Sequence, residues 1–106
     1  MAKCDTGYFC RVCGEYVEDI TTSELYLRFV LGEVALEELF YEADAHITCV
    51  PELAGLIDEQ RFEPFRQWAA ATRARPPERV TRAWRRLQEI PTLGLDIPDY
   101  PLPPDS

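Results

Sequence analysis

Several features that mark an enzyme are scarce or missing in this chain of 106 residues. The sequence has a single histidine, His46, and it contains no glycine-rich phosphate loop and no internal repeat. We also find no pair of carboxylates with the spacing that acid–base catalysis uses. A serine or cysteine nucleophile would need His46 as its general base. We therefore expect that the protein is not an enzyme.

Long apolar runs are also missing. No run approaches the roughly 20 residues that a membrane-spanning helix needs, and the first residues, Met1 to Cys4, contain no apolar signal core. We expect a cytoplasmic protein with no membrane association. Its 46% of hydrophobic residues predicts a folded chain despite nine prolines and a net charge of −8. In a reducing compartment its four cysteines favour thiolate ligands over disulfides.

The metal-binding pattern consists of two ligand pairs. Cys10 and Cys13 form a C-x-x-C motif followed by Gly14, and His46 and Cys49 repeat the same spacing after 32 intervening residues. A lone C-x-x-C also occurs in redox motifs, but two such pairs are typical of structural zinc sites. We predict one tightly bound Zn²⁺, held by Cys10, Cys13, His46 and Cys49.

Two details of this site stay open in the sequence. Cys4 precedes Cys10 by six positions, and it is either a free thiol or a fourth thiolate ligand that replaces His46. Metal-bound histidines usually donate their second ring nitrogen to a hydrogen-bond acceptor, and Glu42 is a candidate for that role.

The arrangement of these ligands resembles the treble-clef group of zinc folds. In that group a zinc knuckle is followed by ligands at the start of a helix, and here Pro51 and Glu52 after Cys49 predict such a helix start. The resemblance covers only the four ligands and their flanks and implies no function. The largely helical insert departs from the β-hairpin usual in the group.

The remaining sequence predicts helices. Apolar spacing predicts a mostly α fold with a small zinc-knuckle, treble-clef-like substructure and few short strands. Trp68 and Trp84 lie on predicted apolar stripes, so we expect both to be buried. A strand remains an alternative for the first helix. The predicted helices span 23–31, 34–43, 51–59, 62–73 and 78–90.

Charge is distributed unevenly along the chain. Residues 1–60 carry 3 basic and 13 acidic side chains, whereas residues 61–90 carry 8 basic and 3 acidic ones. These two regions either face one another in the fold or form a binding surface. We expect a protein-interaction or regulatory module that binds another protein, with a nucleic-acid-binding regulator as the alternative. The residues proposed to bind a nucleic acid or another partner are Arg75, Arg79, Arg82, Arg85 and Arg86.

The C-terminal segment is rich in proline. We predict a single zinc-stapled domain over residues 1–90 and an extended tail over residues 91–106. Alternating Leu93, Leu95 and Ile97 could lie in an apolar groove of the same domain or of a second copy, so the tail is a candidate route to a homo-oligomer. Its P-x-x-P pattern is also compatible with a recognition peptide.

Overall fold

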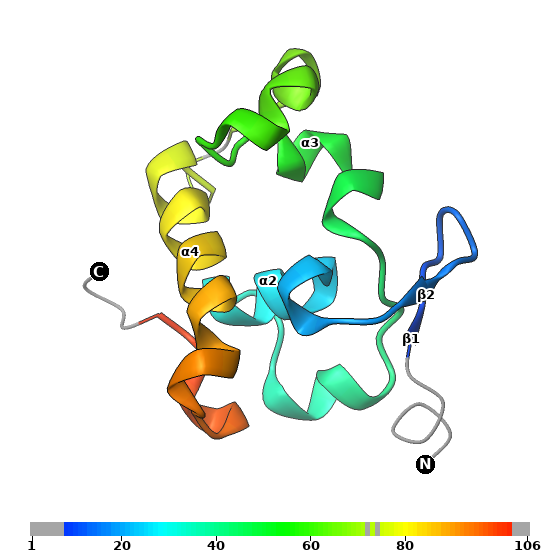
Figure 1. Cartoon of the computed structure of the whole chain (residues 1–106), viewed down its shortest axis with the longest axis vertical. Coiled ribbons are helices and arrows are strands. Elements are labelled where there is room, and N and C mark those ends of the chain that lie inside the picture. The colour runs from blue at the N-terminus through cyan, green and yellow to red at the C-terminus, as the bar shows by residue number, and fades with distance from the viewer. Residues whose placement is uncertain (1–7, 72, 74, 103–106) are drawn as a thin grey trace.

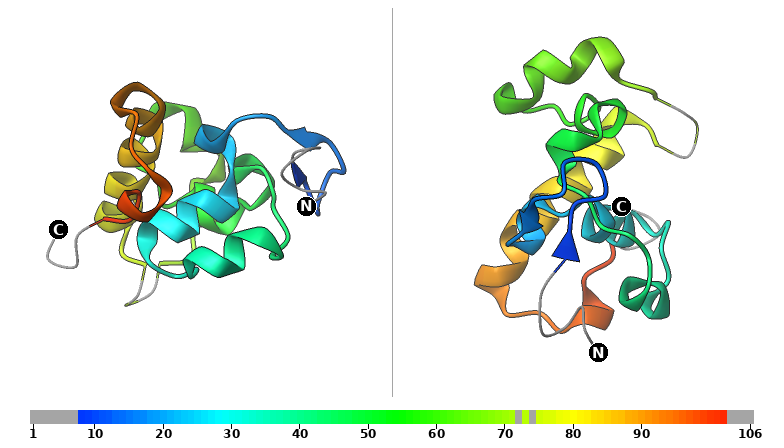
Figure 2. Two further views of the ribbon diagram at one scale, coloured as in Figure 1. Left: turned by 90° about the horizontal axis from the view of Figure 1, so that it is seen from below. Right: turned by 90° about the vertical axis from the view of Figure 1, so that its right-hand side faces the viewer.

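The computed structural model describes residues 8–71, 73 and 75–102 and is mostly helical (Figure 1). Two α-helices form its frame, α2 (Glu24–Leu31) and α4 (Pro77–Leu93). A short helix, α3 (Pro51–Ala54), lies between them in the chain, and β1 (Tyr8–Phe9) pairs antiparallel with β2 (Tyr16–Val17). The β1–β2 hairpin and α4 lie at opposite ends of the molecule (Figures 1 and 2).

Five 3₁₀ segments connect these elements in the described chain. They are η1 (Ile20–Thr22), η2 (Leu36–Phe40), η3 (Ile47–Cys49), η4 (Gln60–Trp68) and η5 (Ile97–Asp99). No helix among the described residues is long and apolar enough to cross a lipid bilayer.

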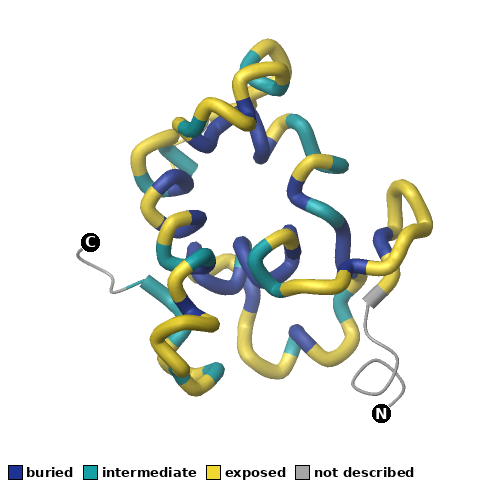
Figure 3. Tube along the Cα trace, in the orientation of Figure 1, coloured by how far each residue is buried: buried dark blue, intermediate teal, exposed yellow. Residues whose placement is uncertain are grey.

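Helix α2 is the central element of the core. It begins at Ser23, whose hydroxyl accepts a hydrogen bond from the Tyr26 amide at 3.1 Å, as expected of an N-cap serine. It ends at Gly32, which has φ +89°, a conformation that favours glycine. Every residue of α2 except Arg28 is buried, and the predicted helix 23–31 is confirmed. Buried residues of α2 and α4 belong to one core cluster, and Figure 3 shows where the buried residues lie along the chain.

Helix α4 supplies the opposite wall of the core. Its buried residues recur at helical spacing: Val80, Thr81, Ala83, Trp84, Leu87 and Ile90. Trp84 is only 6% exposed, so its predicted burial is confirmed. The helix continues through Pro91 to Leu93 and is capped by Gly94 at φ +66°, three residues beyond the predicted end. Pro91 can be accommodated because its fixed φ suits a helix and only one backbone hydrogen bond is lost in the last turn.

The middle of the chain is less regular than its apolar spacing predicts. In the region predicted as helix 34–43, only Leu36–Phe40 is helical, with 3₁₀ geometry. The helix predicted over 51–59 stops at Ala54. Arg66 donates to the carbonyl groups of Gly55 and Ile57, so these backbone acceptors have a hydrogen-bond partner after the helix ends. The Arg66 side chain thus supplies donors to carbonyl groups beyond the helix end, and the Ile57 carbonyl also accepts from the Glu59 amide at 2.9 Å.

Segment η4 replaces the helix predicted over 62–73, and the predicted burial of Trp68 is wrong. Phe62 is buried against the edge of Trp84, with ring centroids 5.5 Å apart. Phe65 is half-buried and Trp68 is 53% exposed. Exposure therefore increases along the segment, and η4 projects from the molecule beyond α3 (Figure 1).

The segment after α4 returns to the core and is not extended over its whole described length. Leu95, Ile97, Tyr100 and Leu102 pack against the core, and the Leu102 amide donates to the Val30 carbonyl at 2.9 Å. Of the two arrangements left open by the sequence, these contacts are with the same domain, and a homo-oligomer through the tail stays a prediction. Residues 103–106, which complete the P-x-x-P pattern, lie outside the described chain.

Candidate metal centre

The β1–β2 hairpin positions the first ligand pair. Its loop is closed by two backbone hydrogen bonds, from the Cys10 amide to the Glu15 carbonyl at 2.8 Å and from the Gly14 amide to the Cys10 carbonyl at 2.9 Å. Gly14, directly after the second cysteine, adopts φ +79°, a conformation that favours glycine. This turn brings Cys10 and Cys13 to the same side of the loop, as a zinc knuckle requires.

Backbone amides surround the sulfur of Cys10. The amides of Val12, Cys13 and His46 point at its Sγ from 3.4, 3.5 and 3.4 Å respectively. Burial by itself raises the pKa of the Cys10 thiol, but these amides, which favour the thiolate, lower the pKa to about 6. Cys10 is therefore prepared to act as a thiolate ligand near neutral pH.

The second ligand pair, His46 and Cys49, lies in a segment that forms two isolated β-bridges with other parts of the chain. Ser23 and His46 form an isolated antiparallel bridge, and Cys10 and Asp44 form a parallel one. Cys49 follows within η3, where its amide donates to the His46 carbonyl at 2.9 Å. The segment carrying His46 is thus fixed between the hairpin and the start of α2.

These elements bring the four predicted ligands together. The Sγ atoms of Cys10, Cys13 and Cys49 and a ring nitrogen of His46 all lie within 4.8 Å of one another. His46 Nδ1 is 3.4 Å from Cys13 Sγ and 3.8 Å from Cys49 Sγ. In a tetrahedral zinc site the sulfur–nitrogen separation is about 3.5 Å, from bond lengths of about 2.3 and 2.0 Å. The group is therefore positioned to bind a metal ion.

The second ring nitrogen of His46 has a defined partner. Nε2 lies 3.1 Å from the Tyr16 carbonyl oxygen, which can only accept a hydrogen bond. The proton is accordingly assigned to Nε2, and the lone pair of Nδ1 is directed toward the cysteines. The sequence suggested Glu42 as this partner, but the partner is the backbone carbonyl of Tyr16. This bond orients the imidazole as histidine ligands are usually oriented.

Cys49 differs from Cys10 in its electrostatic surroundings. Burial, together with the neighbouring sulfurs of Cys10 and Cys13, raises the pKa of the Cys49 thiol to about 12. Burial and the neighbouring sulfurs disfavour the Cys49 thiolate, so Cys49 retains its proton until a cation compensates the charge. A bound divalent cation would be that compensation.

Asp44 is a structural residue of the site that sequence reasoning missed. Its Oδ1 accepts hydrogen bonds from Ser23 Oγ at 2.8 Å, the Ala45 amide at 2.7 Å and the Leu25 amide at 3.3 Å. Its backbone carbonyl accepts from the Arg11 amide at 3.0 Å. Asp44 thus joins the His46 segment to α2 through its buried carboxyl and to the hairpin through its backbone carbonyl. The only sequence signal was an acidic residue between two alanines, two positions before a ligand.

A second buried acid joins the hairpin to α2. Glu24 is buried, and its carboxylate pairs with Arg28 at 2.8 Å and with Arg11 at 3.2 Å. Arg11 lies between the two cysteines of the first motif, so this contact fixes the loop that carries them.

The predicted arginine surface is largely engaged within the chain. Arg75 pairs with Glu33, and its Nε donates to the Glu33 carboxylate at 2.7 Å. Arg85 pairs with the Glu59 carboxylate at 3.1 Å. These two pairs link the basic region to the acidic first half, which was one of the two arrangements left open by the sequence.

Two further arginines of the predicted surface bind backbone carbonyls. Arg86 donates to Tyr100 at 2.7 Å and to Asp99 at 2.6 Å, while Arg79 approaches the Leu31 carbonyl at 3.4 Å. Arg82 is exposed.

Cys4, the alternative ligand, lies outside the described residues. The fold and site together define a mostly helical protein with a Cys₃His group positioned to bind a metal ion. Comparisons with models of known families, with curated proteins and with solved structures found no match.

Proposed function

We propose that Cys10, Cys13, His46 and Cys49 hold one structural Zn²⁺. The observation that carries this proposal is the complete set of four protein ligand atoms within 4.8 Å of one another. Three thiolates and one imidazole are the donors that zinc prefers, and Cys₃His sites with four protein ligands are closed structural sites. The treble-clef-like arrangement remains part of this proposal.

The zinc would fasten the hairpin to the helical body. Each strand of the hairpin has two residues, and an isolated two-stranded hairpin is marginally stable in water. The site has its own small buried cluster of Cys10, Val17 and Ala45, separate from the main core. We therefore expect that metal removal loosens the hairpin first, since metal binding in such sites is coupled to local folding.

The proposed role is protein binding, and the supporting surface is the exposed side of the hairpin. Phe9 is 61% exposed, Val12 59% and Tyr16 43%, and the rings of Phe9 and Tyr16 pack edge to face with centroids 5.7 Å apart. We call these three side chains the hairpin face. Aromatic residues held by a rigid turn are typical anchors of protein interfaces.

The alternatives have less support. A closed ligand set leaves no coordination position for a substrate, so we propose that the protein is not an enzyme. Nucleic-acid binding would require free cations, whereas Arg75, Arg85 and Arg86 have partners within the chain. Titration with duplex and single-stranded nucleic acid at about 0.15 M salt, the physiological ionic strength, should show no micromolar binding. Salt-sensitive binding lost in an Arg79→Ala/Arg82→Ala variant would favour the alternative.

The zinc proposal is tested by metal analysis of protein purified under reducing conditions with zinc present. We expect one zinc per chain, and a large loss in Cys13→Ser and Cys49→Ser. Cys4→Ser should retain zinc; if it does not, Cys4 is the fourth ligand in place of His46. Protein without zinc or another metal under these conditions would refute the proposal.

The protein-binding proposal is tested by site-specific crosslinking. A photoreactive phenylalanine analogue replaces Phe9 in cells that naturally make the protein, and the matched control replaces Trp68, which is 53% exposed on the projecting segment η4. We expect one discrete protein adduct from position 9 and none from position 68, with loss of the adduct in Cys49→Ser. Equal labelling from both positions would contradict a specific hairpin face.

A further inference from the structure

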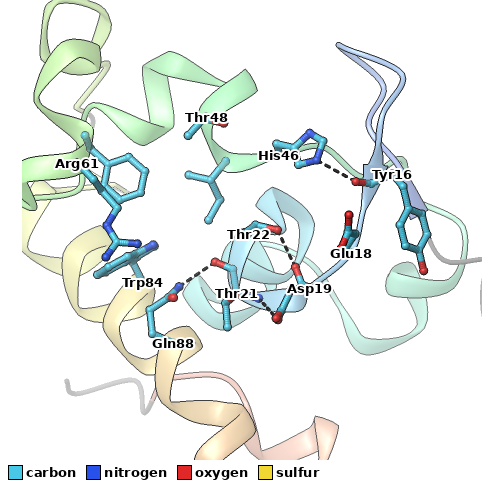
Figure 4. A pocket seen from close by; sticks show the side chains of 12 residues that line it. Tyr16, Glu18, Asp19, Thr21, Thr22, His46, Thr48, Arg61, Trp84 and Gln88 are labelled. Atoms are coloured by element: carbon cyan, nitrogen blue, oxygen red, sulfur yellow. Dashed lines mark hydrogen bonds between the residues drawn. The ribbon is translucent and has the colours of Figure 1, made fainter.

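A cavity of about 510 Å³ opens beside the metal centre, between the η1–His46 region and the η4–α4 region (Figure 4). Small-molecule sites usually have volumes of about 300–1,000 Å³. The Gln88 side chain on α4 donates to the Thr21 carbonyl at 2.8 Å and joins the two sides of the cavity. This contact links α4 to η1.

The inner surface of this cavity is apolar. Ile47, Phe62 and Trp84 line it and are buried residues of the main core. The edge-to-face packing of Phe62 on Trp84 fixes this floor. Such a surface can bury an apolar side chain of a ligand.

One wall of the cavity is cationic. The Arg61 guanidinium lies over the Trp84 ring, 5.2 Å from its centroid. Among the described residues Arg61 has no hydrogen bond or ion pair, so the stacked guanidinium keeps its donors available. An arginine in this state is well suited to bind a carboxylate with two parallel hydrogen bonds.

The opposite wall is acidic. Glu18 and Asp19 line it, and Figure 4 shows these two acids across the cavity from Arg61. Thr21, Thr22 and Thr48 also line the cavity. Asp19 uses one oxygen to cap η1 through the Thr21 amide at 3.1 Å. In the described part of the chain, neither acid forms an ion pair.

We propose that this cavity binds a short zwitterionic peptide with apolar side chains. The peptide carboxylate pairs with Arg61, its ammonium group pairs with Glu18 and Asp19, and an apolar side chain covers Ile47 and Trp84. A purely apolar ligand would leave both walls unused, and a ligand of one charge would approach an opposing wall of the same sign. A peptide of two or three residues separates its charges by about 7–10 Å, at about 3.3–3.6 Å per residue.

The experiment titrates trileucine into the zinc-loaded protein carrying Trp68→Phe, so that Trp84 is the single fluorescent tryptophan. Binding should change the Trp84 emission and saturate at submillimolar concentration, with one site by calorimetry. Two end-blocked probes, N-acetyl-trileucine and trileucine amide, should each bind at least tenfold more weakly, since each lacks one charge-assisted hydrogen bond. Equal binding of either blocked form would overturn the requirement for both charges.

Variants then assign each charge to a wall. Arg61→Gln should weaken trileucine binding about tenfold. The variant should no longer distinguish a free carboxyl end from an amidated one, so it should bind trileucine amide no more weakly than trileucine. Glu18→Gln with Asp19→Asn should remove the preference for a free amino end in the same way. The control is Arg82→Gln, an exposed arginine of α4 outside this cavity, which should leave binding unchanged. Absence of saturable binding, or an equal loss in the Arg82 and Arg61 variants, would refute the proposal.

Discussion

Replacing Asp44 by alanine should destabilise the protein strongly, although Asp44 has no predicted contact with the metal. Its Oδ1 accepts from Ser23 Oγ, the Ala45 amide and the Leu25 amide. The Leu25 amide lies in the first turn of α2, where amides have no partner within the helix. Alanine would leave all three buried donors without this acceptor.

The magnitude follows from these three hydrogen bonds. An unsatisfied buried donor costs about 1–3 kcal/mol, and water entering the space left by the carboxyl can serve part of this demand. The carboxyl also has one buried oxygen, Oδ2, without a partner in the described structure, so the wild-type arrangement is itself not ideal. We therefore expect a loss of about 3–5 kcal/mol for Asp44→Ala and about 1–2 kcal/mol for Asp44→Asn, which keeps an acceptor oxygen.

The assay is urea unfolding of the zinc-loaded protein followed by far-ultraviolet circular dichroism. With a slope of about 2 kcal/mol per M, a loss of about 4 kcal/mol moves the midpoint by about 2 M. The apparent zinc affinity should fall as well, because the Asp44 carboxyl holds the segment that leads to His46 against the start of α2. Glu37→Ala serves as the control, since Glu37 is exposed.

Ser23 provides an independent check of this reasoning. Its hydroxyl donates to Asp44 and also accepts from the Tyr26 amide as the N-cap, so Ser23→Ala should cost about 0.5–2 kcal/mol. Ser23 and Asp44 share a hydrogen bond. The double variant should therefore lose less stability than the sum of the losses of the two single variants. An Asp44→Ala midpoint equal to that of Glu37→Ala, or strict additivity with Ser23→Ala, would show that the proposed network does not stabilise the fold.

Three further predictions test the metal centre and the core. Zinc binding near neutral pH should release at least one proton per chain, because Cys49 with a pKa of about 12 is protonated beforehand whereas Cys10 with a pKa of about 6 is largely ionised. The zinc affinity should therefore rise with pH, and calorimetry in buffers of different ionisation enthalpy would contradict this if no proton were released. Trp84→Ala should cost about 3–5 kcal/mol and the exposed Trp68→Ala within about 0.5 kcal/mol, so equal shifts in thermal unfolding would show that the burial of the two indoles is wrong. Gly55→Ala should cost about 1–3 kcal/mol, because its added Cβ would overlap the Phe65 carbonyl oxygen; thermal unfolding unchanged from wild type would contradict this close approach.

The grouping of the four candidate ligands was predictable from the sequence because it depends on short-range geometry within each pair. Two residues between paired ligands allow one turn to aim both side chains at a point, and Gly14 permits the positive φ at the end of the first turn. The helix carrying Trp84 was equally readable, since its apolar residues repeat every three or four positions and so share a face whatever they pack against.

The sequence by itself therefore determined the candidate ligand pattern, the mostly helical class and the two longest α-helices in the described chain, α2 and α4. Tertiary structure decided which groups complete the site, because their partners are far apart in the chain: Asp44 binds Ser23 from 21 positions away, and Gln88 reaches Thr21 from 67 positions away. It also decided the exposure of Trp68. Periodicity places a residue on one side of a helix, but only the packing of η4 determines where the core ends.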